Sequence, residues 1–84
     1  MEKGAKVARS AINETIRNQI RYNDPPETKQ TYDRLLALGK NKDEVMDLIG
    51  SVISVEIFEI LKNNKPFNRE RFVRNLSNLP ALPF

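Results

Sequence analysis

The sequence predicts a small all-α domain: a bundle of about four helices followed by an extended apolar tail. Three observations predict it. The chain has 84 residues, the length of a single domain spanning 1–84. Residues that start and stop helices recur along it, and the apolar residues between them follow the spacing of an α-helix. Only residues 52–55 have the β-branched composition of a strand, and no similar segment is available to pair with them.

Residues 6–22 are expected to form an amphipathic helix with basic and polar side chains on the opposite face. Its apolar stripe is narrow and contains small alanines, so the helix buries little by itself. Two roles follow from that: the helix caps the bundle, or residues 1–22 form a separate association helix that reaches another chain. The stripe consists of Ala5, Ala8, Ile12, Ile16 and Ile20.

The second predicted helix spans residues 25–38. Asp24 is expected to cap it, Pro25 to occupy its first turn, and Glu27 to complete a capping box. Gly39 follows the last apolar residue and suits the left-handed conformation that ends a helix.

The third predicted helix spans residues 42–62, with Asn41 as its cap and Glu44 as the capping-box glutamate. Its apolar residues cover a wide sector, roughly 200° at 100° per residue, which is typical of a central helix packed on more than one side. Gly50 would allow another helix to approach closely. This segment is therefore expected to be the hub of the bundle.

The last predicted helix spans residues 69–78, with Asn68 as its cap and Phe67 and Phe72 as a hydrophobic staple. After it, two prolines enforce an extended course on the tail Leu79-Pro80-Ala81-Leu82-Pro83-Phe84. The tail is expected to pack across the central helix.

The composition excludes most catalytic chemistry. There is no cysteine and no histidine, so thiolate nucleophiles, imidazole bases, disulfides and zinc fingers are all absent. Asp43, Glu44 and Asp47 lie where a helix dipole stabilises acids, and they lack the loop of a calcium site. The sequence therefore predicts a protein that is not an enzyme and has no metal or cofactor. It contains no signal-peptide run and no stretch of ~20 apolar residues, so a cytoplasmic location without membrane contact is expected.

The charge is unevenly distributed. Residues 1–22 have a net charge of +3, residues 23–62 of −3, and residues 63–84 of +3. Such a chain can fold its basic ends over its acidic middle, pair with a copy of itself, or bind an external polyanion.

Glu56 is predicted to lie within the apolar face of the central helix, where an unpaired carboxylate costs several kcal/mol. A structural role is favoured: either an arginine or Tyr32 from another helix is its partner, or the helix lies at the surface there. The alternative is a functional role, as a ligand contact or a general base.

Arg69, Arg71 and Arg74 form a basic patch that could meet nucleic-acid phosphates, although a solvated helix face is the favoured interpretation. The two helices joined around residues 39–41 are also similar to a helix-turn-helix. The second of them is acidic at its start and mostly apolar, which disfavours a recognition helix.

Several segments between residues 22 and 80 together resemble a family of small bacterial helical domains of unknown function. The resemblance implies a compact, all-helical, cytoplasmic bacterial domain with no established activity to transfer. Some similar sequences have histidines on the central helix, and this chain has none. The segments are 23–27, 31–35 with Gly39, 43–45, 48–50, 56–58, 67–68 and 79–80.

The favoured function is a non-enzymatic interaction or self-assembly module, either a homo-oligomer, with a dimer favoured, or a complex with another protein. The apolar surface of the central helix and the tail is large for 84 residues to cover. The alternative is a nucleic-acid-associated accessory protein that uses the basic terminal helices; an enzyme with Glu56 as base and Tyr32 beside it is least favoured. The candidate interaction residues are Ile12, Ile16, Ile20, Glu56, Arg69, Arg71, Arg74, Leu82 and Phe84.

Overall fold

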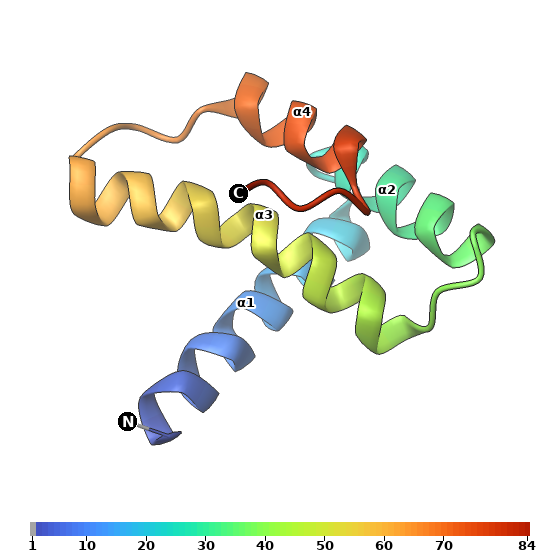
Figure 1. Ribbon diagram of the computed structural model, residues 1–84, viewed down its shortest axis with the longest axis horizontal. Helices are drawn as coiled ribbons and strands as arrows, with labels where there is room; N and C mark the ends of the chain where they lie inside the picture. The colour runs from blue at the N-terminus through green and yellow to red at the C-terminus, as the bar shows by residue number, and fades with distance from the viewer. Residues whose placement is uncertain (1) are drawn as a thin grey trace.

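The computed structural model describes the backbone of residues 2–84 and the side chains of residues 9–84, and this part of the chain contains four helices and no strand. The helices are α1 (Glu2–Tyr22), α2 (Pro26–Ala37), α3 (Lys42–Asn63) and α4 (Arg69–Asn78). The predicted all-α bundle is confirmed. α3 packs against all three other helices, as expected for the hub, and α2 also contacts α1 and α4 (Figure 1).

α1 begins at Glu2, four residues before the predicted start, and crosses α3 near the middle of both helices (Figure 1). Ile16 is fully buried, and Ile12 and Ile20 pack against the core. The side chains of Ala5 and Ala8 lie outside the described residues. The second half of α1 therefore belongs to the core of one chain, and the association role of residues 1–22 stays a prediction.

The start of α2 differs from the prediction. Its cap is Pro25, in an extended conformation (φ −75°, ψ 149°), and no side chain caps the helix. The residue before a proline is disfavoured in the helical region, so Pro26 forces Pro25 out of the helix. The predicted Asp24 cap and its capping box with Glu27 are wrong for this reason.

The end of α2 confirms the prediction for Gly39, which has a φ of +95°. The Gly39 amide donates to the carbonyl of Leu36 (3.0 Å) and the Lys40 amide to that of Leu35 (3.4 Å). These are the paired bonds of a Schellman motif, which requires a left-handed residue at Gly39.

α3 starts with the predicted capping box. The Glu44 amide donates to Asn41 Oδ1 (2.9 Å), and the Asn41 amide donates to Glu44 Oε1 (3.4 Å). Further along, a Cβ built on Gly50 would lie 3.3 Å from Cγ2 of Ile12. The predicted close helix approach at Gly50 is therefore confirmed, and α1 is the helix that makes it.

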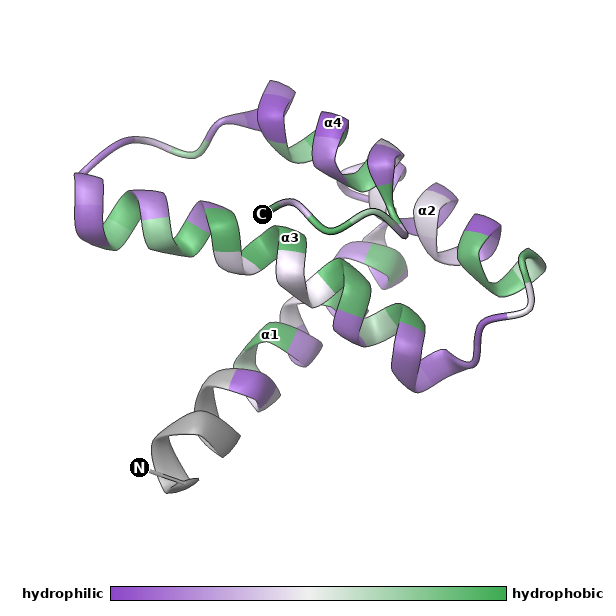
Figure 2. Ribbon diagram, viewed as in Figure 1, coloured by the Kyte–Doolittle hydropathy of each residue, from purple (hydrophilic) through white to green (hydrophobic). Residues whose placement is uncertain are grey.

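The core lies where α3 crosses the other helices, so the apolar faces turn inward there (Figure 2). In the described part of the chain, every buried side-chain nitrogen and oxygen has a hydrogen-bond partner. No helix within residues 2–84 is long and apolar enough to cross a bilayer. The buried apolar residues are Ile16, Leu35, Val45, Ile49, Val52, Ile53, Phe72, Leu76 and Leu79.

α4 has its predicted cap, since the Arg71 amide donates to Asn68 Oδ1 (2.9 Å). The staple is also present, with the Phe67 and Phe72 rings 5.4 Å apart. After α4, only Leu79 is buried in the core.

The tail runs over α3 in Figure 1, but Leu82 is 55% exposed and Phe84 is 84% exposed. The prediction that the tail packs its apolar side chains across the hub is therefore wrong for these two residues. Pro80 and Pro83 prevent the helix that would give them a shared face, and Leu79 already fills the core position at this end.

Candidate functional site

Glu56 of α3 is 3% exposed and is held by α4 and the residue that caps it. Arg71 donates from Nε to Oε2 (2.7 Å) and from Nη2 to Oε1 (3.0 Å). The Asn68 amide also donates to Oε1 (3.1 Å). The prediction that an arginine from another helix satisfies this carboxylate is confirmed, and Tyr32 is not its partner.

The hydrogen bonds from Arg71 lower the pKa of Glu56, against the opposing effect of burial, and the Asn68 amide lowers it further. Glu56 is therefore ionised at neutral pH, with both oxygens occupied. Such a carboxylate is a poor general base because its affinity for a proton is low. The geometry indicates that Glu56 links α3 to α4.

The three predicted patch arginines of α4 do not form one site. Arg71 is half-buried in the ion pair with Glu56 instead of solvated, which corrects the prediction that it lies on a solvated face. Arg69 Nη2 lies 3.1 Å from Glu27 Oε1 on α2. Arg74 is exposed and has no ion pair among the described residues.

The ion pairs between helices explain the uneven charge. Arg9 of α1 pairs with Asp47 of α3 (2.6 Å), while Arg69 and Arg71 of α4 pair with acids of α2 and α3. Each pair joins an arginine of a basic terminal segment to a carboxylate of the acidic middle. The possibility that the chain folds its basic ends over its own middle is therefore confirmed.

Arg34 is a structural residue that the sequence analysis missed. From the last turn of α2, its Nη1 donates to the carbonyl of Leu79 (2.9 Å) and its Nη2 to that of Leu76 (3.0 Å). These carbonyls end α4, where a cation is also favoured by the helix dipole. No sequence pattern predicts the contact, because the partners lie more than forty residues away.

Replacing Arg34 by alanine is expected to lower the free energy of unfolding by about 1.5–3 kcal/mol, the typical contribution of hydrogen bonds to a charged group. Arg34→Lys should recover only part of the loss, because a single ammonium does not reproduce the guanidinium fork. Urea unfolding at pH 7 measures both variants. Equal stability of wild type and Arg34→Ala would contradict a capping role.

An exposed apolar cluster lies on the second half of α3. Ile57 is 40% exposed, Phe58 52% and Leu61 80%. Together with α1 they line a groove of about 460 Å³, which we call the α1/α3 groove. Its other lining residues are Ala11, Ile12, Thr15, Ser54 and Lys62.

The candidate interaction residues are dispersed in the structure. Ile12 lines the α1/α3 groove, whereas Ile16 is core and Ile20 is half-buried against it. Phe84 lines a separate pocket beside Ile12 and Gly50.

Sequence analysis did not identify Phe58 and Leu61 as interaction residues. Residue periodicity shows which side of α3 is apolar, but it does not show where the neighbouring helices end.

Within the described side chains, no group of three or more acidic residues could hold a metal ion.

Comparison of the chain with protein-family models, curated proteins and solved structures finds no match. The resemblance to a family of small bacterial helical domains therefore stays a prediction. The functional proposals below rest on the residues and geometry of this chain.

Proposed function

We propose that this protein is a non-enzymatic self-assembly module that forms a homodimer through the α1/α3 groove. The observation that supports the proposal best is the exposure of Phe58 and Leu61 on consecutive turns of one helix. Single exposed apolar residues are ordinary, but a cluster beside an apolar groove is typical of an interaction site.

α1 and α3 cross near their middles (Figure 1), and the groove is lined by side chains of both helices. A partner in the groove would cover apolar surface that the chain leaves in water.

A second copy is the partner that the charge pattern favours. A two-fold interface brings the same patch of both chains together, so the patch must complement itself. Glu59 and Lys62 lie three residues apart beside Phe58 and Leu61. If two copies of α3 pack antiparallel about a two-fold axis between residues 60 and 61, Glu59 of each chain faces Lys62 of the other. Lys62 also lies over the Phe58 ring (5.3 Å to the centroid), so it can cover this edge of the surface.

Nucleic-acid binding has less support than self-association. Arg69 and Arg71 already bind carboxylates of the same chain. They would have to break these pairs to reach phosphates, and so would Arg9 of α1, which pairs with Asp47.

Leu61→Lys is expected to raise the dissociation constant of the dimer at least about tenfold, because each interface loses an apolar side chain worth about 1.5–3 kcal/mol when buried. Leu38→Lys is the matched control: Leu38 is also exposed (61%) at a helix C-terminus, but it does not line the groove. Sedimentation equilibrium measures both variants. Equal dissociation constants for the two variants would overturn the proposal.

A further inference from the structure

The tail after α4 lies beside the α1/α3 groove. It runs along α3 toward the second half of that helix, where the groove lies (Figure 1). Phe84 lines a pocket of about 550 Å³, and Ile12 and Ser54 line both this pocket and the groove. The pocket and the groove are therefore neighbours, and Phe84 lies next to the surface proposed for self-association.

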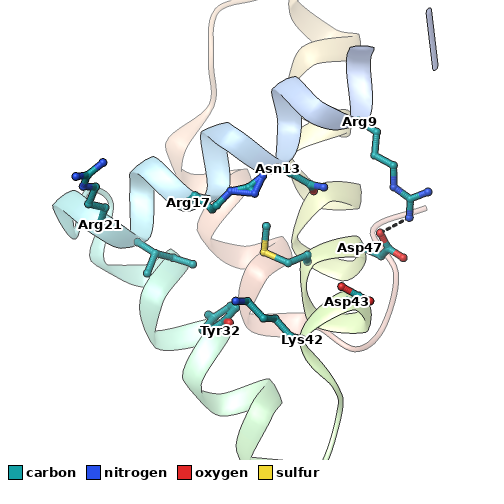
Figure 3. Close-up of a pocket in the computed structure, with 10 residues that line it drawn as sticks. Arg9, Asn13, Arg17, Arg21, Tyr32, Lys42, Asp43 and Asp47 are labelled. Atoms are coloured by element: carbon teal, nitrogen blue, oxygen red, sulfur yellow. Dashed lines mark hydrogen bonds and ion pairs between the residues drawn. The ribbon is translucent and has the colours of Figure 1, made fainter. Parts of the chain in front are cut away.

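The polar part of this pocket lies away from the groove. Arg9 of α1 and Asp47 of α3 form an ion pair there (2.6 Å; Figure 3), and Asp47 lies about two helical turns before Ser54. Phe58 lies on the other side of Ser54, one turn further along the same face of α3. Since Arg9 is already bound by Asp47, the apolar surface that Phe84 can cover lies toward Phe58.

Residues 82–84, which we call the strap, are held only at their start. Leu79 is 1% exposed, and its carbonyl accepts from Arg34. The Ala81 amide donates to the end of α4 (2.9 Å), and in the described part of the chain no backbone hydrogen bond holds the strap itself. Three residues span up to about 10 Å, which exceeds one helical turn of about 5.4 Å. The strap can therefore move Phe84 along α3 without moving the core.

The strap and the groove both leave apolar side chains in water. Phe84 and Leu61 are the two most exposed large apolar residues among the described side chains, at 84% and 80%, and Phe58 is 52% exposed. Contact between the strap and the groove would remove apolar surface of both from water, and Phe84 and Phe58 can form an aromatic pair. The fold thus places one exposed apolar segment within reach of another.

We propose that the strap closes over the α1/α3 groove of its own chain, with the Phe84 ring against Phe58, and thereby competes with a second copy. The inference rests on the proposed function, because it concerns the regulation of the same groove. The structure shows the open form of the strap. A dimer requires an open strap in each chain, so closure raises the observed dissociation constant by the inverse of the open fraction for each chain.

Closure is tested first in the monomer, by NMR at a concentration at which sedimentation equilibrium gives a mass of 9.7 kDa. We expect nuclear Overhauser cross-peaks between the ring protons of Phe84 and those of Phe58. Phe84→Ala removes these cross-peaks and so identifies them. Their absence from the wild type would overturn the proposal, whether or not the protein dimerises.

Competition with a second copy is tested by sedimentation equilibrium. Phe84→Ala is expected to lower the dissociation constant of the dimer at least about threefold, because the groove is then free in every chain. Tyr22→Ala is the matched control and should leave the constant unchanged. Tyr22 is also an exposed aromatic residue (68%), but it lines neither the pocket nor the groove.

Two results would overturn the competition. An equal constant in wild type and Phe84→Ala would show that the strap does not cover the interface, and a higher constant in Phe84→Ala would place Phe84 in the interface between copies. A wild type that stays at 9.7 kDa at every concentration would overturn the proposed function instead, and the cross-peaks would then decide closure alone. Circular dichroism spectra matching that of the wild type show that each variant is folded.

Discussion

Glu56→Gln is expected to lower the free energy of unfolding by about 1.5–3 kcal/mol at pH 7, because the neutral amide loses the charge-assisted hydrogen bonds from Arg71. Urea unfolding measures the loss. Glu14→Gln is the matched control: Glu14 is exposed on α1 and has no ion pair among the described side chains. An equal loss in the two variants would contradict the joining role of Glu56.

The same pair predicts a pH dependence. Arg71 lowers the pKa of folded Glu56 below its ordinary value of 4.5, so the unfolded chain binds a proton more readily than the folded one. The stabilisation is therefore fully present above that ordinary value and is lost as the pH falls through the lower folded pKa. The difference in stability between wild type and Glu56→Gln should shrink from pH 7 to below pH 4.5. A difference that grows on acidification would contradict the assignment.

Removing the arginine should be the more damaging change. Arg71→Met leaves a carboxylate that is 3% exposed with only the Asn68 amide as a donor. Removing one partner of a buried pair is costly, whereas replacing both by apolar residues is often neutral. The double variant Glu56→Met/Arg71→Met should therefore be more stable than Arg71→Met alone. A double variant less stable than Arg71→Met would contradict a pairwise ion pair.

Ile16→Ala is expected to lower the free energy of unfolding by about 2–5 kcal/mol, because it empties a fully buried site between α1 and the rest of the core. This is a large share of the roughly 4–13 kcal/mol expected for a chain of this length. Ile20→Ala is the comparison on the same face, and its half-buried position should make it less costly. Thermal and urea unfolding measure both variants.

If α1 served association alone, Ile16→Ala would leave the unfolding of the monomer unchanged. That result would contradict the packing described here. The dissociation constant of the dimer should be unchanged in Ile16→Ala, because Ile16 does not line the α1/α3 groove.

The features that could be predicted from sequence are those set by near neighbours in the chain. Asn41, Asn68 and Gly39 act on backbone groups within a few residues, and each was found where the sequence placed it. The prediction of the start of α2 was wrong because two conformational restrictions compete at the adjacent prolines. Pro25 suits a first helical turn, but Pro26 excludes it from the helical region.

The features that could not be predicted depend on distant partners. The burial of Glu56 followed from the apolar face around it, but the choice of Arg71 among the arginines required the position of α4. The role of Arg34 at the end of α4 could not be predicted, because its acceptors are backbone carbonyls, which have no sequence pattern. The exposure of Leu61 depends on the length of α3 beyond its neighbours.

Sedimentation equilibrium of the wild-type protein at two concentrations about a hundredfold apart tests self-association most directly. The proposal predicts a mass that rises with concentration from 9.7 kDa toward twice that value. It also predicts that the rise is lost in Leu61→Lys and kept in Leu38→Lys. A mass of 9.7 kDa at both concentrations would contradict the proposed assembly.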